Sequence, residues 1–357
     1  METKEHVQQG RSGIYFALMA ALLFGASTPF SKILLGSSDP IVLAALLYLG
    51  SGVGLTLWWK LRRSRTSPNT QEAGLKRADL PWLAGAILSG GVVGPILLLF
   101  GLRITPASSA SLLLNLEGVF TALLAWFVFK ENFDRRIALG MAAITLGGLL
   151  LSWSGKPELS VALGPLGIAG ACLAWGIDNN LTRRVSAGDP VQIAALKGLI
   201  AGAVNLSIAL TVGAVLPNVR AIAMAASIGF LGYGVSLTLF VLALRHIGTA
   251  RTGACFSLAP FAGAAISIVL LHDKPTRYFL GAAALMAIGV WLHLTERHGH
   301  EHRHQSMEHE HRHSHDEHHR HHAESELLAR THSHWHRHEE LIHIHPHYPD
   351  VHHRHSH

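Results

Sequence analysis

Three ionisable side chains, Glu117, Asp178 and Lys197, lie inside long apolar segments of the sequence. A charged group in such surroundings is costly unless it is paired or binds a ligand, so each is a candidate for function. A carboxyl group removed from water is suited to binding a proton, a cation or an amine. Asn179 and Asn180 follow Asp178 directly and could hydrogen-bond a polar ligand or join two helices. These five residues are the candidate substrate-binding positions.

A second group of chemically capable residues stands at the end of the chain, where residues 296–357 contain 23 of the 27 histidines. Many occupy alternate positions, which share one side of an extended strand. Neutral imidazole is a good ligand for zinc, nickel, cobalt and copper(II), so we expect this tail to bind such metals. No structural zinc spacing recurs, which favours several exchanging sites on a largely disordered tail, briefly helical over 323–330. The candidate metal ligands are His309, His311, His313, His315, His332, His334, His336, His338, His343, His345 and His347.

The elements that must position these residues are apolar stretches close to the roughly 20 residues that a helix needs to cross a membrane. Short charged or proline-containing links separate them, and such a succession leaves almost no polar face for water. The sequence therefore predicts an all-α integral membrane protein with ten transmembrane helices. The predicted helices cover 13–35, 41–60, 82–102, 107–129, 135–154, 162–183, 191–213, 220–243, 249–271 and 277–295.

Basic residues predict the orientation. If the N-terminus, residues 1–12, is cytoplasmic, the inner links hold twelve Lys and Arg residues and the outer links six. Cytoplasmic links carry the excess of Lys and Arg in membrane proteins, so both termini should lie in the cytoplasm. We expect a multi-pass protein of the plasma (cell inner) membrane, with the histidine-rich tail on its cytoplasmic side.

The chain is duplicated. Asp39-Pro40-Ile41-Val42 resembles Asp189-Pro190-Val191-Gln192 at an offset of 150, and each is followed at the same distance by an Ala-Ala-Leu step. Further along, Leu102-Arg103 matches Leu244-Arg245, and Glu131 matches Asp273, both at an offset of 142. The repeat assigns residues 13–154 to a first five-helix unit, 155–161 to a linker and 162–295 to a second unit. An odd number of helices in each unit makes the second enter the membrane inverted, which is typical of alternating-access carriers.

Particular motifs resemble a known family. Phe24-Gly25-Ala26-Ser27 in the first helix, and Asn115-Leu116-Glu117-Gly118-Val119 continuing to Phe129-Lys130-Glu131, are similar to the EamA-type drug/metabolite transporter superfamily. The resemblance covers about residues 13–295 and implies a ten-helix carrier of amino acids, metabolites or toxic compounds, often coupled to protons. Gly118 stands where the family pattern commonly has proline, while Pro260 is kept in the second half, so a weaker break is expected in the fourth helix. The tail lies outside the resemblance.

Helical rise places the charged residues at defined depths. Glu117 lies about 15 Å into the helix 107–129, close to the midplane. Asp178 lies about 8 Å inside Arg183, and Lys197 lies about 10 Å into the antiparallel seventh helix, so their depths agree. We predict that Asp178 and Lys197 form a buried ion pair; the alternative is that the lysine extends to the cytoplasmic surface. For Glu117, the alternative is a structural glutamate that is protonated or paired.

The leading interpretation is a secondary transporter, expected to be an exporter, that carries a small organic solute by alternating access. The pair has no counterpart in the first half, where Ser27 and Leu47 stand, so solute recognition should be asymmetric. No catalytic cluster indicates an enzyme, no cofactor is required, and the expected partners are the lipid bilayer and the solute, without nucleic acid. Glycines four residues apart are assigned to internal packing, although the spacing is also compatible with a homodimer: Gly50 and Gly54, Gly90 and Gly94, Gly198 and Gly202.

Other functions remain open at this stage. A divalent-metal transporter, or a metal-regulated carrier, would use the tail as collector or sensor. A membrane-anchored metal buffer would transport nothing, whereas a merely solubilising tail would have no metal-related role. Protonation of the imidazoles would reverse the charge of the tail, which would suit a pH sensor.

Overall fold

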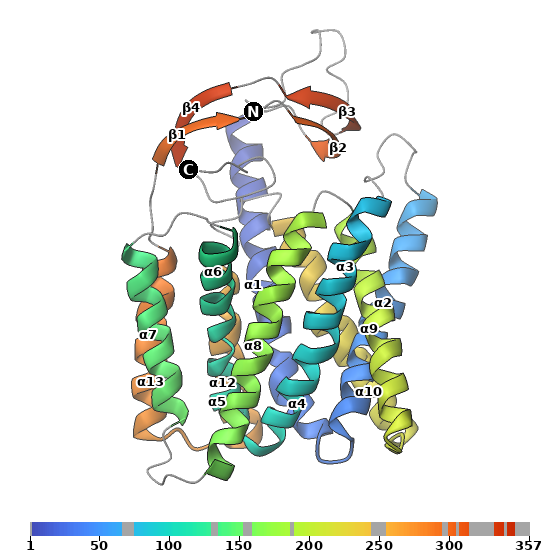
Figure 1. Ribbon diagram of the computed structural model, residues 1–357, viewed down its shortest axis with the longest axis vertical. Helices are drawn as coiled ribbons and strands as arrows, with labels where there is room; N and C mark the ends of the chain where they lie inside the picture. Colours follow the sequence, from blue (N-terminus) through green and yellow to red (C-terminus); the bar gives the residue numbers. More distant parts are fainter. Residues whose placement is uncertain are drawn as a thin grey trace.

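The computed structural model shows a bundle of helices with a short β-structure above one end (Figure 1). It describes residues 2–65, 75–129, 135–152, 159–185, 189–243, 255–294, 299–304, 307–313, 332–338 and 341–346. Each of the ten predicted helices has a counterpart within these ranges. α1 begins at Glu2 instead of at residue 13, because the preceding stretch is rich in Glu, Lys and Gln, which favour helix.

The bounds of the helices follow the two halves of the chain. The first half contains α1 (Glu2–Leu34), α2 (Pro40–Arg65), η2 (Arg77–Asp79), α3 (Leu80–Ala86), η3 (Ile87–Val93), α4 (Gly94–Ile104), α5 (Ala107–Leu113), α6 (Leu116–Phe129) and α7 (Arg135–Ser152). The second half contains α8 (Leu159–Val185), α9 (Pro190–Thr211), α10 (Val219–Gly229), η4 (Phe230–Val235), a helical stretch over 236–243, α12 (Ala259–Leu271) and α13 (Arg277–Leu294).

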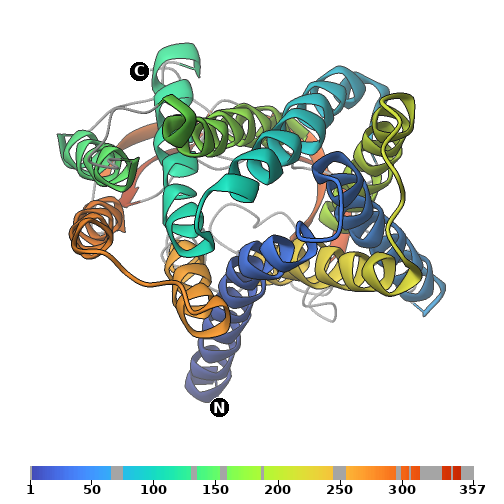
Figure 2. The ribbon, with the colours of Figure 1, turned by 90° about the horizontal axis from the view of Figure 1, so that it is seen from below.

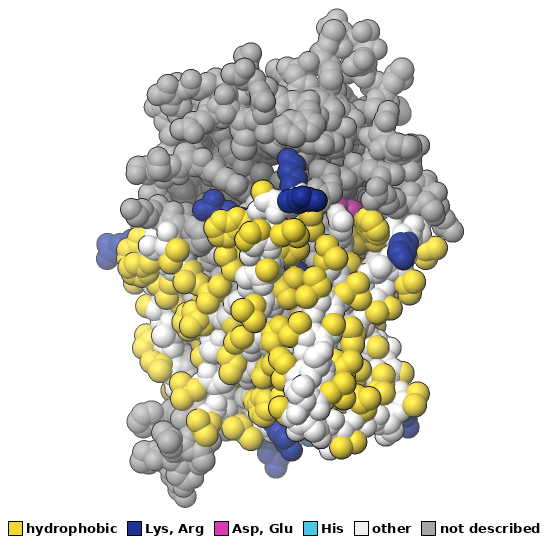
Figure 3. Space-filling view, turned by 45° about the vertical axis from the view of Figure 1, so that its right-hand side comes forward, with side chains coloured by type: hydrophobic (Ala, Val, Ile, Leu, Met, Phe, Trp, Pro, Cys, Tyr) yellow, Lys and Arg dark blue, Asp and Glu magenta, His cyan; other side chains and the backbone are white. Residues whose placement is uncertain are grey.

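Several of these helices are long and apolar enough to cross a membrane. Among the described residues, six helical segments meet this condition. On the face in Figure 3, hydrophobic side chains cover the middle of the bundle, whereas Lys and Arg gather towards its two ends. Large apolar side chains such as Leu88 are exposed on the bundle, as expected where lipid is the solvent. The chain is a multi-pass integral membrane protein.

The two halves are interleaved. α1 begins and α13 ends at the same end of the bundle (Figure 1), and Figure 2 shows the helices along their axes. α2 packs against its counterpart α9, and α7 packs against α13. The first helix of each half also packs against the fourth helix of the other half, because α1 contacts α12 and α8 contacts α6. The predicted glycines serve this packing: Gly50 lies against Ala226, and Gly198 lies against Gly52.

Both halves depart from regular α-helix at equivalent places. The third helix of each half contains a π-helical segment, η3 over Ile87–Val93 and η4 over Phe230–Val235. The two segments end at positions 142 residues apart, which is the offset that relates the later parts of the sequence repeat. A π-helical segment inserts a residue and leaves some carbonyls without their usual helical partner. The repeat is therefore visible in the local backbone as well as in the sequence.

The fourth helix is broken in both halves, so the expectation of a weaker break in the first half is wrong. Residues 114–115 form a turn between α5 and α6, and residues 257–258 form a turn before α12. The backbone N–H and the side-chain amide of Asn115 both donate to the Leu112 carbonyl, at 3.1 and 2.9 Å, and so close the turn. Proline at position 118 is not needed, because the turn is closed by this asparagine upstream of Gly118.

The tail contains strands where its composition predicts disorder. β1 (Gly299–His304) pairs with β4 (Leu341–Pro346), and β2 (Met307–His313) pairs with β3 (His332–His338), both antiparallel. Alternating residues, with Trp335, Ile342 and Ile344 among them, favour extended backbone, and this tendency outweighs the low apolar content. The helix predicted over 323–330 lies outside the described residues.

Candidate functional site

Glu117 lies in the first turn of α6, directly after the break of the fourth helix. Its side chain is half-buried, and its Oε1 atom accepts a hydrogen bond from Asn179 Nδ2 of α8 at 2.8 Å. Asn179 Nδ2 also lies 3.2 Å from Thr121 Oγ1, one turn further along α6. Within the described part of the chain, the other carboxylate oxygen of Glu117 has no hydrogen-bond partner. One acceptor of this carboxylate is therefore available to a ligand.

The predicted ion pair between Asp178 and Lys197 is present. Lys197 Nζ lies 2.6 and 2.8 Å from the two carboxylate oxygens of Asp178, which is buried. Thr182, one helical turn after Asp178 on α8, donates to the carboxylate at 2.7 Å and lies 3.0 Å from Lys197 Nζ. The alternative in which Lys197 extends to the membrane surface is excluded by this geometry. Both carboxylate oxygens of Asp178 and the ammonium group of Lys197 thus have partners within this cluster.

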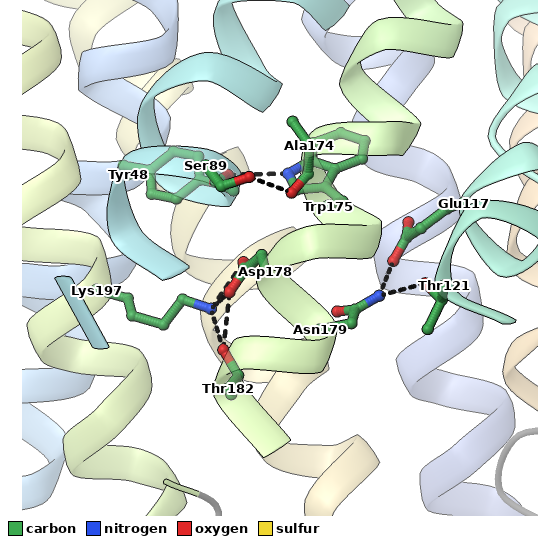
Figure 4. Close-up of polar contacts among 11 residues, drawn as sticks. Tyr48, Ser89, Glu117, Thr121, Ala174, Trp175, Asp178, Asn179, Thr182 and Lys197 are labelled. Atoms are coloured by element: carbon green, nitrogen blue, oxygen red, sulfur yellow. Dashed lines mark hydrogen bonds and ion pairs between the residues drawn. The ribbon is translucent and has the colours of Figure 1, made fainter. Parts of the chain in front are cut away.

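Asp178 and Asn179 leave α8 on opposite sides (Figure 4), so one turn of a single helix supplies both polar clusters. Successive residues on an α-helix point about 100° apart, which accounts for this divergence. Asp178 turns towards α9 and η3, whereas Asn179 turns towards α6. The structure thus places the sequence-predicted residues around one segment of α8, but it divides them into two separate groups.

Asn180 has a structural environment. It is buried, and its amide donates to the Gly176 carbonyl at 2.8 Å and to the Thr121 carbonyl at 3.2 Å. The bond to Thr121 ties α8 to a backbone group of α6, as asparagine commonly does between membrane helices, whereas the bond to Gly176 lies within α8. Of the two asparagines proposed from the sequence, Asn179 is exposed and donates to Glu117, whereas Asn180 is buried and joins α8 to α6.

The π-helix η3 forms the wall behind Asp178. The Gly90 carbonyl accepts hydrogen bonds from the Tyr48 hydroxyl at 2.7 Å and from the Trp175 indole at 2.9 Å, and Asn205 donates to the Gly91 carbonyl at 2.9 Å. Side chains from α2, α8 and α9 therefore satisfy carbonyls that the π-helix leaves exposed. A Cβ atom on Gly90 would overlap the Asp178 carboxylate, so only glycine leaves room for the ion pair.

Sequence reasoning missed Tyr48, Trp175 and Thr182. Thr182 carries a usable signal, because it stands four residues after Asp178 and therefore on the same face of a helix. Tyr48 and Trp175 carry none, since aromatic residues are common in membrane helices and their partner is a backbone carbonyl. A π-helix could not be predicted from the period of the apolar residues.

A row of aromatic rings leads away from the same point. Tyr48 lies 5.6 Å from Tyr233, Tyr233 lies 6.0 Å from Phe24, and Phe24 lies 5.5 Å from Phe256, measured between ring centroids. Phe256 in turn lies 4.8 Å from Phe240. The row begins at Tyr48, whose hydroxyl group binds the carbonyl of Gly90 beside Asp178. Ring faces near a carboxylate provide a surface suited to a cation with an apolar body.

The equivalent place in the other half lacks the charges. Ser27 of α1 corresponds to Asp178 and donates to the Phe24 carbonyl at 2.6 Å, while Gly232 of η4, the counterpart of Gly90, packs against Ser27. Ala259 corresponds to Glu117, and Gly25 packs against its backbone. The two halves thus differ here: the contact between α8 and α6 is polar, whereas the contact between α1 and α12 is closely packed and uncharged.

The proposed metal ligands are placed by the backbone of the tail. Most of them fall within β2, β3 and β4, whereas His315 and His347 lie outside the described residues. Among the side chains that the structure describes, there is no group of three or more His, Cys, Asp or Glu residues that could hold a metal ion.

Known proteins resemble this chain over most of its length. A family described as the EamA-like transporter family matches residues 11–153 and 162–295. An uncharacterized transporter of Methanothermobacter thermautotrophicus (strain ATCC 29096 / DSM 1053 / JCM 10044 / NBRC 100330 / Delta H) is 29% identical over 296 residues, covering 78% of this chain and 85% of that protein. The uncharacterized transporter YyaM of Bacillus subtilis (strain 168) is 26% identical over 230 residues, covering 60% and 74%.

A solved crystal structure has the same fold. It superposes with a TM-score of 0.58 at 17% identity and covers 79% of this chain and 95% of its own, a likeness that concerns the fold alone. The family match falls on both halves of the bundle, and its two ranges together span the polar cluster around α8. The chain is a membrane transporter and belongs to the EamA-like transporter family.

Proposed function

We propose that the protein is a secondary transporter that exports a small organic solute with a positively charged group, and that Glu117 contacts this group. The observation that carries the proposal is the unpaired oxygen of the Glu117 carboxylate beside the exposed Asn179. Glu117, Asp178 and Lys197 together carry one net negative charge when ionised, so a monovalent cation or a proton balances the cluster.

The Glu117–Asn179 hydrogen bond joins the two halves, so its length depends on their relative position. Glu117 belongs to the first half and Asn179 to the second, so a rocking motion of one half against the other changes their separation. A solute that replaces Asn179 as partner of Glu117 binds the two arrangements with different affinity, which is what a ligand must do to shift their populations. The proposed cycle therefore couples solute binding to the contact between α6 and α8.

Asp178 and Lys197 have a different proposed role. Both belong to the second half, and their bond holds α8 to α9. Because the pair is internally neutral and buried, it fixes the position of α8 so that Asn179 faces Glu117. We treat both as positioning residues, and Glu117 and Asn179 as the residues that contact the solute. Asn180 completes the attachment of α8 to α6.

The proposal includes an orientation. The basic residues of the links favour both termini in the cytoplasm of a cell whose plasma membrane holds the protein, with the halves divided at 155–161. Export then means movement from the side that carries the tail. Tagging either terminus with a group that only an impermeant reagent detects, in intact and in opened cells, tests this orientation directly.

A second candidate is a transporter of divalent transition metals, or a carrier that such metals regulate. The observation in its favour is the histidine-rich tail. For metal as cargo, the ion would have to leave imidazole ligands and enter a cluster of two carboxylates, a lysine and amides. Imidazoles suit zinc and copper(II), whereas this oxygen-rich cluster does not. Regulation by metal bound at the tail is compatible with the organic solute.

Proteoliposomes loaded with a solute panel separate these functions. The panel contains primary amines, quaternary ammonium compounds, neutral and acidic analogues of the same size, and Zn²⁺. We compare the full chain, a chain ending at Arg297 and the variant Glu117→Gln. Movement of amines that needs Glu117 and survives loss of the tail supports the proposal. Movement of Zn²⁺ that survives loss of the tail supports the metal transporter, and movement of neither overturns both.

A further inference from the structure

The four strands of the tail share one register. Gly299 lies opposite Pro346 at the start of β1, and Met307 lies opposite His338 at the start of β2. The connections between the two sheets have equal lengths, residues 305–306 on one side and 339–340 on the other. The two pairs of strands therefore share one register.

This register sets histidine opposite histidine. Two such pairs lie between β1 and β4 and three between β2 and β3: His300 with His345, His302 with His343, His309 with His336, His311 with His334, and His313 with His332. A slip by one residue would bring His309 opposite Trp335 or Arg337 and would abolish the three matches of β2 with β3. The register therefore places the histidines of both strands on the same face of the sheet, which a slip by an odd number of residues would not do.

Strand geometry brings neighbouring pairs within reach of one metal ion. Directly opposite positions have Cβ atoms about 4.5–5.5 Å apart, and alternate positions along a strand lie about 6.6 Å apart on the same face. His309, His311, His334 and His336 thus occupy four adjacent positions on one face of the sheet. Four imidazoles meet the needs of zinc, nickel or copper(II), and each binds as a neutral ligand.

We propose that the register-paired histidines of β2 and β3 form a site for a divalent transition metal between the two strands. The register pair of Glu308 with Arg337 brings opposite charges together on the other face and favours the same alignment without metal. A two-stranded hairpin is only marginally stable in water, so a metal ion held by both strands stabilises it. The site is independent of the solute that the bundle carries, and its test needs no transport measurement.

A rearrangement that keeps the composition tests the site. Ser333→His, His334→Ser, Trp335→His and His336→Trp, made together, preserve every residue type but move two histidines out of register with β2. The matched control exchanges Arg320 and His321, as Arg320→His with His321→Arg, outside the paired strands. Both variants are made in the full chain, and Zn²⁺ affinity is measured by competition with a chromophoric chelator.

The rearranged protein should bind one Zn²⁺ fewer tightly, with at least about tenfold weaker affinity for that ion, because lost ligands cost no less than lost outer-shell partners. The facing histidines of β1 and β4 are unchanged in this variant. The control should bind as the parent does. Cu²⁺ EPR on the same proteins should show fewer coordinated nitrogens in the rearranged variant. An equal number of tightly bound Zn²⁺ ions and equal coordination in the two variants, or no tight Zn²⁺ binding by the parent, would overturn the proposal and leave a tail in which only the number of histidines matters.

Discussion

Gly90 and Asp178 touch across the boundary between the two halves of the bundle, because a Cβ atom on Gly90 would overlap the Asp178 carboxylate. The carboxylate is held on its other side by Lys197. The π-helix of the third helix is thus in direct contact with the buried ion pair, and the Gly90 carbonyl is fixed by Tyr48 and Trp175. The π-helical backbone at Gly90 and the ion pair of Asp178 with Lys197 therefore depend on each other.

Replacement of Gly90 by alanine should therefore destabilise the protein by about 1–3 kcal/mol, the usual cost of forcing a methyl group into a filled site. The thermal unfolding midpoint in detergent measures the effect. Gly118→Ala is the matched control, since nothing lies within 4 Å of a Cβ atom at that position. Equal midpoints for the two variants would show that Asp178 does not need the space beside Gly90.

Removal of one partner of the ion pair should cost more than removal of both. Lys197→Met leaves a buried carboxylate without its cation, and Asp178→Asn leaves a buried ammonium group, so each single variant should lose about 3–5 kcal/mol of stability. The double variant Asp178→Asn with Lys197→Met should recover much of this loss. Chemical denaturation of the four proteins gives the coupling free energy. Additive losses would mean that the pair does not act as a unit.

Substitutions of the two asparagines should affect different measurements, transport for Asn179 and stability for Asn180. Asn179→Ala should alter transport with little change in stability, because Asn179 is exposed and its partner is the proposed solute ligand Glu117. Asn180→Ala should instead lower stability by about 1–3 kcal/mol, since it removes the two hydrogen bonds of a buried amide, one of which joins α8 to α6. The KM for transport and the unfolding midpoint are measured for both. The assignment fails if Asn180→Ala raises KM while Asn179→Ala leaves it unchanged.

Much of this fold could be predicted from the sequence because membrane helices are encoded by composition and length. The ion pair was also accessible, since Asp178 and Lys197 sit at matching depths on antiparallel helices and neither is tolerable alone. The duplication could be recognised because Asp39-Pro40 corresponds to Asp189-Pro190, and other polar positions correspond in the same order. These inferences depend on local sequence and on helical rise.

Features that depend on contacts between the halves could not be predicted. Nothing in the period of the apolar residues marks Ile87–Val93 as π-helical, and the partners of its carbonyls come from α2, α8 and α9. Asn179 and Asn180 look equivalent in sequence, but the packing of α6 decides which one is buried. Likewise, composition predicted a largely disordered tail, whereas the opposition of His309 with His336 depends on the pairing of β2 with β3.

The central claim, that Glu117 contacts the positive group of the solute, is tested most directly by the kinetics of one amine in proteoliposomes. Loss of a charge-assisted hydrogen bond costs about 1.5–3 kcal/mol, so kcat/KM should fall at least about tenfold in Glu117→Gln. Glu117→Asp, which keeps the charge, should retain part of the activity, and Gly118→Ala should behave as the parent. Transport of the amine by Glu117→Gln at the parent's kcat/KM would contradict the claim.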